Sequence, residues 1–224
     1  MNRYTEPHRH SAALVTIDVQ RDFSLPGAPL EIAGTMDAVP RIRRLLDAFR
    51  AAGQPIVHVV RLYREDGSNV DPVRRAAVEG GLSTAAPGSD GAELVDDLKP
   101  DPTVRLDCDA LLRGEFQRLA QNEYAMYKPR WGAFYETRLE AFLQEHGIDT
   151  IVFAGCNFPN CPRTSIYEAS ERDFRIVAVT DAISGAYDRG IAELRNIGVL
   201  AVTTDEALAW FAGEPLAASL AEGE

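Results

Sequence analysis

Residues 12–18 of this chain read Ala-Ala-Leu-Val-Thr-Ile-Asp, a short apolar run that ends in a carboxylate. Such a run is typical of a strand buried on both faces, as in a parallel sheet covered by helices. Other apolar runs of this kind lie at 56–60, 124–127, 151–154, 176–179 and 199–202. Segments with helical periodicity lie between them, at 39–52, 139–147, 163–172, 187–197 and 206–211. The alternation predicts an α/β fold in three layers (α/β/α), with six mainly parallel strands in a doubly wound sheet.

The length of 224 residues and the hydrophobic content of 46% suit one globular domain, which we place at residues 1–212. Residues 64–122 form a long insertion rich in Gly, Pro and Asp, and we call this segment the flap. The pieces at 92–98 and 111–119 look helical, so the flap is expected to be partly helical. Residues 213–224 are small and acidic, which predicts a mobile C-terminal tail.

The charge balance excludes several classes of partner. There are 23 Lys and Arg against 34 Asp and Glu, a formal net charge of -11, so we expect no nucleic acid and no anionic membrane as a partner. No apolar run approaches the ~20 residues that cross a bilayer, and the N-terminal residues lack the apolar stretch of a secretory signal. Three cysteines form no disulfide framework. These features predict a cytoplasmic protein with free thiols.

The segment Gly155–Ser165 reads Gly-Cys-Asn-Phe-Pro-Asn-Cys-Pro-Arg-Thr-Ser and joins a predicted strand to a predicted helix. Proline is favoured in the first turn of a helix, so Pro162 places Cys161 at the helix N-terminus. The helix dipole favours negative charge there, which predicts a stabilised thiolate. The alternative is that Cys161 is a small buried hydrophobe.

Asp18 and Lys128 also end predicted strands, and ligands of doubly wound sheets bind at the carboxyl ends of the strands. A carboxylate near a thiol can take its proton and return it to a leaving group. A lysine there would keep the carboxylate ionised. The alternatives are a loop-capping aspartate and a solvated surface lysine. Two features argue against a surface lysine: Pro129 stiffens the backbone, and the following segment Trp-Gly-Ala-Phe is apolar.

From about residue 12 to residue 211, the chain resembles the isochorismatase-like cysteine hydrolases. The resemblance rests on Asp18 within Asp-Val-Gln-Arg-Asp-Phe, on Lys128 before Pro129, and on Cys161 six residues after Gly155. It implies Cys161 as nucleophile, Asp18 as general base and Lys128 as electrostatic partner. It also implies an assembly of two or four copies.

The resemblance further implies a cis peptide bond between Cys156 and Asn157, with the backbone amides of Asn157 and Cys161 forming an oxyanion hole. This loop departs from the family pattern, because Phe158 replaces a threonine and Pro162 a valine. Stiffening by Pro159 and Pro162 is one compensation, and a cis Phe158–Pro159 bond is an alternative.

Substrate-binding residues are expected next to the catalytic motifs. The predicted pocket residues are Phe23, Trp131, Phe134 and the side chain of Asn157. Plain core packing is the alternative for Phe134. Arg163, just inside the helix after Cys161, is expected to bind a carboxylate or to form an exposed salt bridge. Aromatic walls favour a flat or small apolar acyl group.

Nicotinamidases resemble this fold but bind a metal through an aspartate and histidines after the second strand. Here His58 is followed by Arg61, Tyr63 and Glu65 with no further histidine nearby. The N-terminal pair His8 and His10 offers too few ligands for a defined site. The sequence therefore predicts no metal and no cofactor.

These observations predict a hydrolase that cleaves a C–N bond of a small amide, ureido compound or lactam through a thioester on Cys161. Three alternatives remain: a vinyl-ether hydrolase of isochorismatase type, a non-catalytic protein of the same fold, and a redox protein using Cys156 and Cys161. A thiol hydrolase with His58 as base is disfavoured, because strand alternation sends His58 toward a helix layer.

Overall fold

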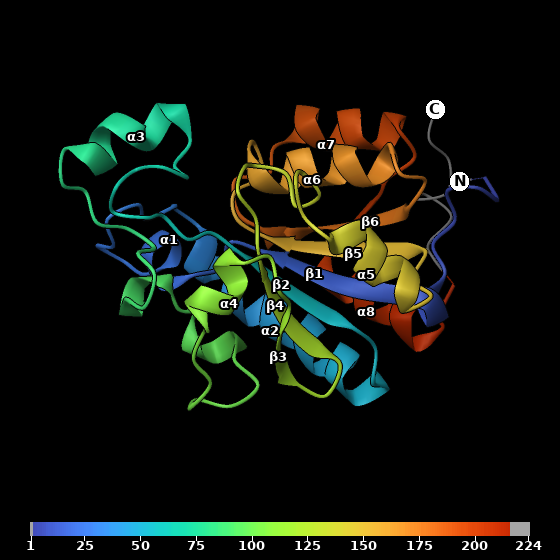
Figure 1. Ribbon diagram of the computed structural model, residues 1–224. Helices are drawn as coiled ribbons and strands as arrows, with labels where there is room; N and C mark the ends of the chain where they lie inside the picture. Colours follow the sequence, from blue (N-terminus) through green and yellow to red (C-terminus); the bar gives the residue numbers. More distant parts are fainter. Residues whose placement is uncertain (1, 216–224) are drawn as a thin grey trace.

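A computed structural model describes residues 2–215, which form one seven-stranded sheet between two layers of helices (Figure 1). The strand order is β3-β4-β2-β1-β5-β6-β7, and every pair is parallel except β3 with β4. The strands are β1 (Ala12–Ile17), β2 (Ile56–Val60), β3 (Gln117–Ala120), β4 (Glu123–Tyr127), β5 (Thr150–Gly155), β6 (Arg175–Ile183) and β7 (Leu200–Val202). The predicted α/β fold is confirmed, with one more strand than the six expected.

The sheet carries helices on both faces. The helices are α1 (Arg21–Ser24), α2 (Thr35–Ala52), α3 (Pro72–Glu79), α4 (Cys108–Leu112), α5 (Leu139–Glu145), α6 (Cys161–Ser170), α7 (Asp188–Asn196) and α8 (Thr204–Ala212). Figure 1 shows α5, α6 and α7 over one face and α2 and α8 over the other. Short 3-10 helices lie at Arg9–Ser11, Asp90–Ala92 and Asp96–Leu98.

Alternation along the strands divides the core into two parts. In β1, Ala13, Val15 and Ile17 pack with residues of α5, α6 and α7. Ala12 and Leu14 point the other way and pack with α2 and α8. All six residues of β1 are buried, which explains why the strand reads as a continuous apolar run.

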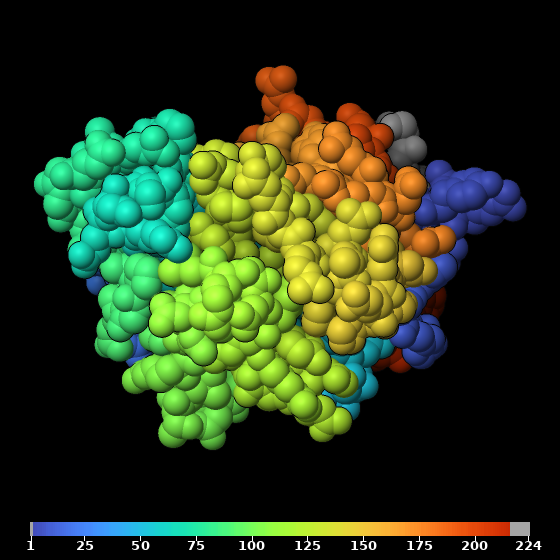
Figure 2. Space-filling view, viewed as in Figure 1, coloured from blue at the N-terminus to red at the C-terminus, as the bar shows by residue number. Residues whose placement is uncertain are grey.

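The flap, residues 64–122, covers the left and lower parts of the face seen in Figure 2. Its helices are not those predicted from the sequence. Residues 92–98 are not a helix; they hold parts of two separate 3-10 turns, because Leu94 forms a bridge with Gln20. The predicted helix at 111–119 was also wrong. Helix α4 ends at Leu112, Gly114 takes a left-handed φ of 81°, and β3 follows as an antiparallel edge strand.

Helix α3 was missed altogether, although Pro72 stands at its start, where proline is favoured. The predicted tail at 213–224 falls almost entirely outside the described residues. None of the helices between residues 2 and 215 combines the length and hydropathy needed to span a bilayer.

Four neighbouring parallel strands end at the same edge of the sheet, and this positions the site. The order β4-β2-β1-β5 places Tyr127 opposite Val60, and Ile17 opposite both Val59 and Gly155. The first residues beyond these strands are Lys128, Arg61, Asp18 and Cys156. All four are buried.

Candidate active site

Asp18 and Lys128 form a buried ion pair at this edge. The Lys128 side chain is fully buried, its Nζ lies 2.9 Å from Asp18 Oδ2, and it also donates to the Arg130 carbonyl at 3.1 Å. Asp18 takes a left-handed φ of 54°, and its amide donates to the Val59 carbonyl at 2.9 Å. The second carboxylate oxygen, Asp18 Oδ1, is buried with no hydrogen-bond partner among the described residues. The pair therefore leaves one basic oxygen available.

Cys161 is the first residue of α6 and lines the same cavity as Asp18. Burial, followed by the negative charge of Asp18, raises the pKa of the Cys161 thiol to about 12, although Lys128 acts in the opposite direction. The stabilisation of a thiolate that the helix N-terminus predicts does not prevail at this site. The helix N-terminus and the lysine are outweighed by desolvation and by the adjacent carboxylate, so the sulfur keeps its proton at neutral pH.

The loop between β5 and α6 begins at Gly155, whose φ of 121° is closed to other residues. A Cβ there would lie 2.2 Å from the Ile17 carbonyl oxygen, so glycine lets β5 pass directly against β1. The predicted cis bond between Cys156 and Asn157 is present. Within residues 2–215 no other peptide bond is cis, so the Phe158–Pro159 alternative is wrong.

The predicted oxyanion-hole donors are the amides of Asn157 and Cys161. Within the described part of the chain, neither amide donates a hydrogen bond to another protein group. A neighbouring amide holds the loop in place: the Phe158 amide donates to the Ser184 carbonyl at 2.7 Å. Both candidate donors are thus left available.

Phe158, the departure from the family pattern, fills a core position. Its side chain is fully buried, and its ring meets Tyr187 edge to face with centroids 5.4 Å apart. A Cβ on Gly190 in α7 would lie 2.4 Å from the Phe158 ring. The Phe158 ring therefore anchors the loop by packing against α7. The threonine of the family pattern is expected to anchor it by a hydrogen bond instead.

The cavity beside Cys161 holds about 20 Å3, room for about one water molecule. It is lined by Asp18, Phe23, Ile32, Arg61, Tyr63, Arg74, Trp131, Cys156, Asn157 and Cys161. The predicted pocket residues Phe23, Trp131 and Asn157 are therefore in its wall. Phe134 does not line it; its ring packs against Phe174 at 5.9 Å and under Arg172 at 5.1 Å, in the core beneath α6.

Sequence reasoning missed Arg61, the residue directly after β2. Its side chain is 2% exposed, and its Nη2 donates to Asp71 Oδ2 at 2.7 Å. Gln20, from the motif after Asp18, holds the Arg61 backbone at both ends: Arg61 N donates to Oε1 at 2.7 Å, and Nε2 donates to the Arg61 carbonyl at 2.8 Å. The sequence could have indicated Arg61, because it directly follows a buried parallel strand, as Asp18 and Lys128 do.

Two other residues lie outside the site. Arg163 points to the surface, where it pairs with Glu193 and donates to the Tyr187 hydroxyl at 2.6 Å. This is the salt-bridge alternative and not a ligand position. His58 is buried within the sheet between Thr16 (2.8 Å) and Glu123 (2.9 Å), which removes it as a base for Cys161.

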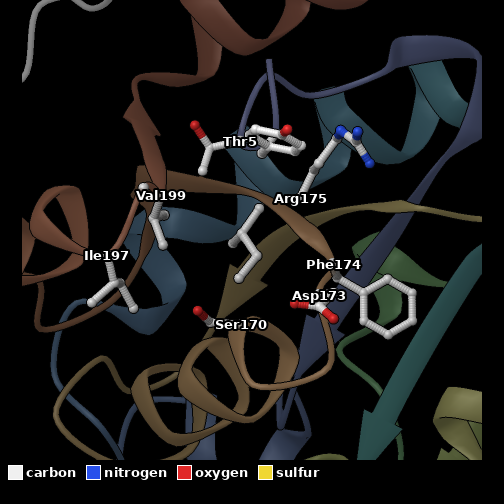
Figure 3. Close-up of a pocket in the computed structure, with 10 residues that line it drawn as sticks. Thr5, Ser170, Asp173, Phe174, Arg175, Ile197 and Val199 are labelled. Atoms are coloured by element: carbon white, nitrogen blue, oxygen red, sulfur yellow. The ribbon is translucent and has the colours of Figure 1, made fainter. Parts of the chain in front are cut away.

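A larger cavity, about 510 Å3, lies at the opposite edge of the sheet, near the amino ends of β6 and β7 (Figure 3). Thr5, Ser170, Asp173, Arg175 and Val199 are among its lining residues, and none of the predicted site residues is. Residues 2–215 contain no group of three His, Cys, Asp or Glu side chains arranged to hold a metal ion.

Comparison with known proteins identifies the family. The Isochorismatase domain profile matches residues 12–107 and 103–206. A protein of Arabidopsis thaliana named "Probable inactive nicotinamidase" is 30% identical over 202 residues, covering 88% of this chain and 94% of that protein. A ureidoacrylate amidohydrolase of Methylobacterium radiotolerans is 28% identical over 204 residues, covering 82% of this chain and 72% of the enzyme. Further matched proteins are likewise named as amidohydrolases or amidases.

The crystal structure of an isochorismatase family protein from Desulfovibrio vulgaris superposes with a TM-score of 0.77 and 33% identity. The match covers 90% of this chain and 98% of that structure. Sequence profile, relatives and fold agree, and the chain belongs to the isochorismatase family.

Proposed function

We propose that the protein hydrolyses the C–N bond of a small amide through a thioester on Cys161, with Asp18 as general base and Lys128 as its electrostatic partner. The chain belongs to the isochorismatase family, and its relatives named as amidohydrolases and amidases favour a hydrolase of carbon–nitrogen bonds other than peptide bonds. The observation that carries the proposal is the buried Asp18–Lys128 pair, with its unpartnered Oδ1, in the cavity that Cys161 lines.

In the first half of the reaction, Cys161 attacks the amide carbon as its proton passes to Asp18. A base is required because the thiol pKa of about 12 leaves almost no thiolate at neutral pH. The new C–S bond moves the carbonyl electron pair onto oxygen. The amides of Asn157 and Cys161 stabilise this oxyanion, worth roughly 3 kcal/mol per donor in comparable sites.

Collapse of the tetrahedral intermediate breaks the C–N bond, and the nitrogen leaves as ammonia or an amine with the proton from Asp18. Water then attacks the thioester while Asp18 accepts one of its protons. The second collapse breaks the C–S bond and releases the acid, and Asp18 returns the proton to the sulfur. Lys128 holds the carboxylate in place, since its Nζ is bonded to both Asp18 and the Arg130 carbonyl.

The direct test is a panel of primary amides, ureido acids and lactams assayed for ammonia or ring opening, with Cys161→Ala as the blank. The proposal expects at least one substrate whose hydrolysis is abolished in Cys161→Ala and in Asp18→Asn. Retention of the activity in Cys161→Ala would contradict it. A redox function would instead require Cys156 as well as Cys161. The matched control is Cys108→Ala, which removes a buried thiol that does not line the cavity and should keep hydrolysis.

A further inference from the structure

We propose that Arg61 and Arg74 form an anion-binding subsite beside Cys161, so that the substrates are small amides that also carry a carboxylate. The inference rests on the proposed function, because it names the substrate class of the same site. It assigns recognition to two arginines that belong to neither the catalytic residues nor the expected pocket wall.

Arg61 is a buried guanidinium with unused donors. Only Nη2 is hydrogen-bonded, to Asp71; Nε and Nη1 are buried without a partner among the described residues. Leaving buried donors unsatisfied costs free energy, more so for a charged group. Because Arg61 lines the cavity with Cys161, a ligand oxygen there would satisfy donors that the protein leaves open.

The surroundings of Arg61 fix its position. Gln20 binds both its amide and its carbonyl, and Gln20 is itself fully buried and bonded to the Ala92 carbonyl at 2.7 Å. The guanidinium carbon lies 4.8 Å from the Tyr63 ring centroid. The Tyr63 hydroxyl donates to the same Asp71 oxygen at 3.2 Å. A guanidinium held in this way is preorganised, which lowers the entropic cost of binding an anion.

Arg74 brings a second cation from the flap. It lies on α3, its guanidinium carbon is 4.8 Å from the Trp131 ring centroid, and Nη1 is 3.6 Å from Asp71 Oδ2. It lines the same cavity and is partly exposed. One arginine from the sheet edge and one from the flap thus face one small space, an arrangement suited to a planar carboxylate.

The charges of the cavity point the same way. The lining cations Arg61 and Arg74, together with the adjoining Lys128, outnumber the carboxylates of Asp18, which lines the cavity, and of Asp71, which pairs with Arg61. An uncharged amide would leave one positive charge uncompensated in this partly exposed site. A substrate carboxylate would balance it, while the amide carbon of the same molecule is presented to the sulfur.

The test uses the full chain with Cys161→Ala, which binds without turnover, and calorimetric titration with succinamate and with the uncharged butanamide. We expect succinamate to bind and butanamide to bind at least tenfold more weakly. Adding Arg61→Gln should weaken succinamate binding on the order of 30-fold, since it removes the charged partner of a buried anion, and should leave butanamide unchanged. Arg61→Lys, which keeps the positive charge but not the planar guanidinium, should bind succinamate with an affinity between those of the proteins with Arg61 and with Arg61→Gln.

Two further variants keep the test decisive. Arg74→Gln removes a partly exposed cation and should weaken succinamate selectively even if Arg61→Gln fails to fold. Arg163→Gln is the control, because Arg163 pairs with Glu193 outside the cavity, and it should change neither titration. Equal binding of both amides, or equal loss of both in Arg61→Gln and Arg74→Gln, would overturn the subsite. Selective succinamate binding without hydrolysis of any amide by the wild-type protein would overturn the proposed function and leave the subsite standing.

Discussion

Asp18 has two opposed effects on Cys161. Its negative charge raises the pKa of the thiol and so disfavours a resting thiolate, yet in the proposed mechanism its unpartnered Oδ1 is the base that accepts the proton during attack. Lys128 opposes the rise in the pKa of Cys161, and because it pairs with Oδ2 of Asp18 it leaves Oδ1 without a partner. The proposed mechanism therefore forms the nucleophile only when a substrate is bound, and we expect free thiol reagents to meet a protonated sulfur.

This conflict gives Asp18→Asn effects of opposite sign. Removing the carboxylate charge while Lys128 remains should lower the pKa of Cys161, so that alkylation by iodoacetamide at pH 7.5 becomes faster. Amide hydrolysis should be lost, because an amide side chain accepts no proton. Peptide mass spectrometry of Cys161, with buried Cys108 as internal reference, measures the first effect. Slower alkylation together with lost hydrolysis would contradict this account.

At the scale of elements, the loop after β5 depends on Gly155. Its φ of 121° and the closeness of its Cα hydrogens to the Ile17 carbonyl leave no room for a side chain. The loop carries both proposed oxyanion donors, so a displaced β5 end would move them as well. Gly147, at the turn after α5, also has a positive φ (68°), but a Cβ there meets nothing within 4 Å.

Gly155→Ala should therefore prevent folding or cost several kcal/mol, while Gly147→Ala should cost about 1 kcal/mol, the price of a left-handed conformation alone. Urea unfolding followed by circular dichroism measures both. Similar losses of unfolding free energy in the two variants would show that the close approach to β1 has no role.

The carboxyl ends of β1 and β4 were predictable from sequence because a charged residue follows each apolar run, and this rule found Asp18 and Lys128. It applies equally to Arg61, which follows the apolar run of β2 but belongs to none of the family motifs. Trp131 and Phe134 lie in one apolar segment of the sequence. Only the packing of the folded chain places Trp131 in the cavity wall and Phe134 in the core. Protonation of Cys161 was beyond prediction, since it depends on burial. Edge strand β3 was missed because 111–119 has helical spacing.

At the scale of the whole molecule, a buried network joins three elements. Glu123 in β4 accepts hydrogen bonds from Arg50 of α2, through Nε and Nη2 at 2.8 Å each, and contacts His58 of β2 at 2.9 Å. Burial opposes ionisation of Glu123, but the hydrogen bonds and charges of Arg50 and His58 outweigh it and lower its pKa to about 2. The usual value is 4.5.

Because the folded pKa is below the unfolded one, the stabilisation is complete above about pH 4.5 and is lost as the pH falls toward 2. The shift corresponds to about 3 kcal/mol. Glu123→Gln should lower the unfolding free energy at pH 7 by an amount of that order and flatten its dependence on pH between 4.5 and 2. Urea titrations of both proteins across this range are the measurement. Parallel pH curves would contradict the assignment.

The cavity holds about 20 Å3, so we expect its walls to move when a substrate larger than water binds. Arg74 on α3 is the lining residue that the flap contributes, and it would move with that helix. Assembly into two or four copies stays a prediction, which light scattering on the purified chain measures.

The central claim is that Cys161 carries the acyl group during hydrolysis. Acid quenching of the wild-type protein during turnover of an amide from the panel, followed by peptide mass spectrometry, tests it most directly. The account predicts a mass increase equal to the acyl group on the peptide with Cys161, and none in Cys161→Ala. Steady hydrolysis with no adduct in the wild type, and unchanged hydrolysis in Cys161→Ala, would contradict it.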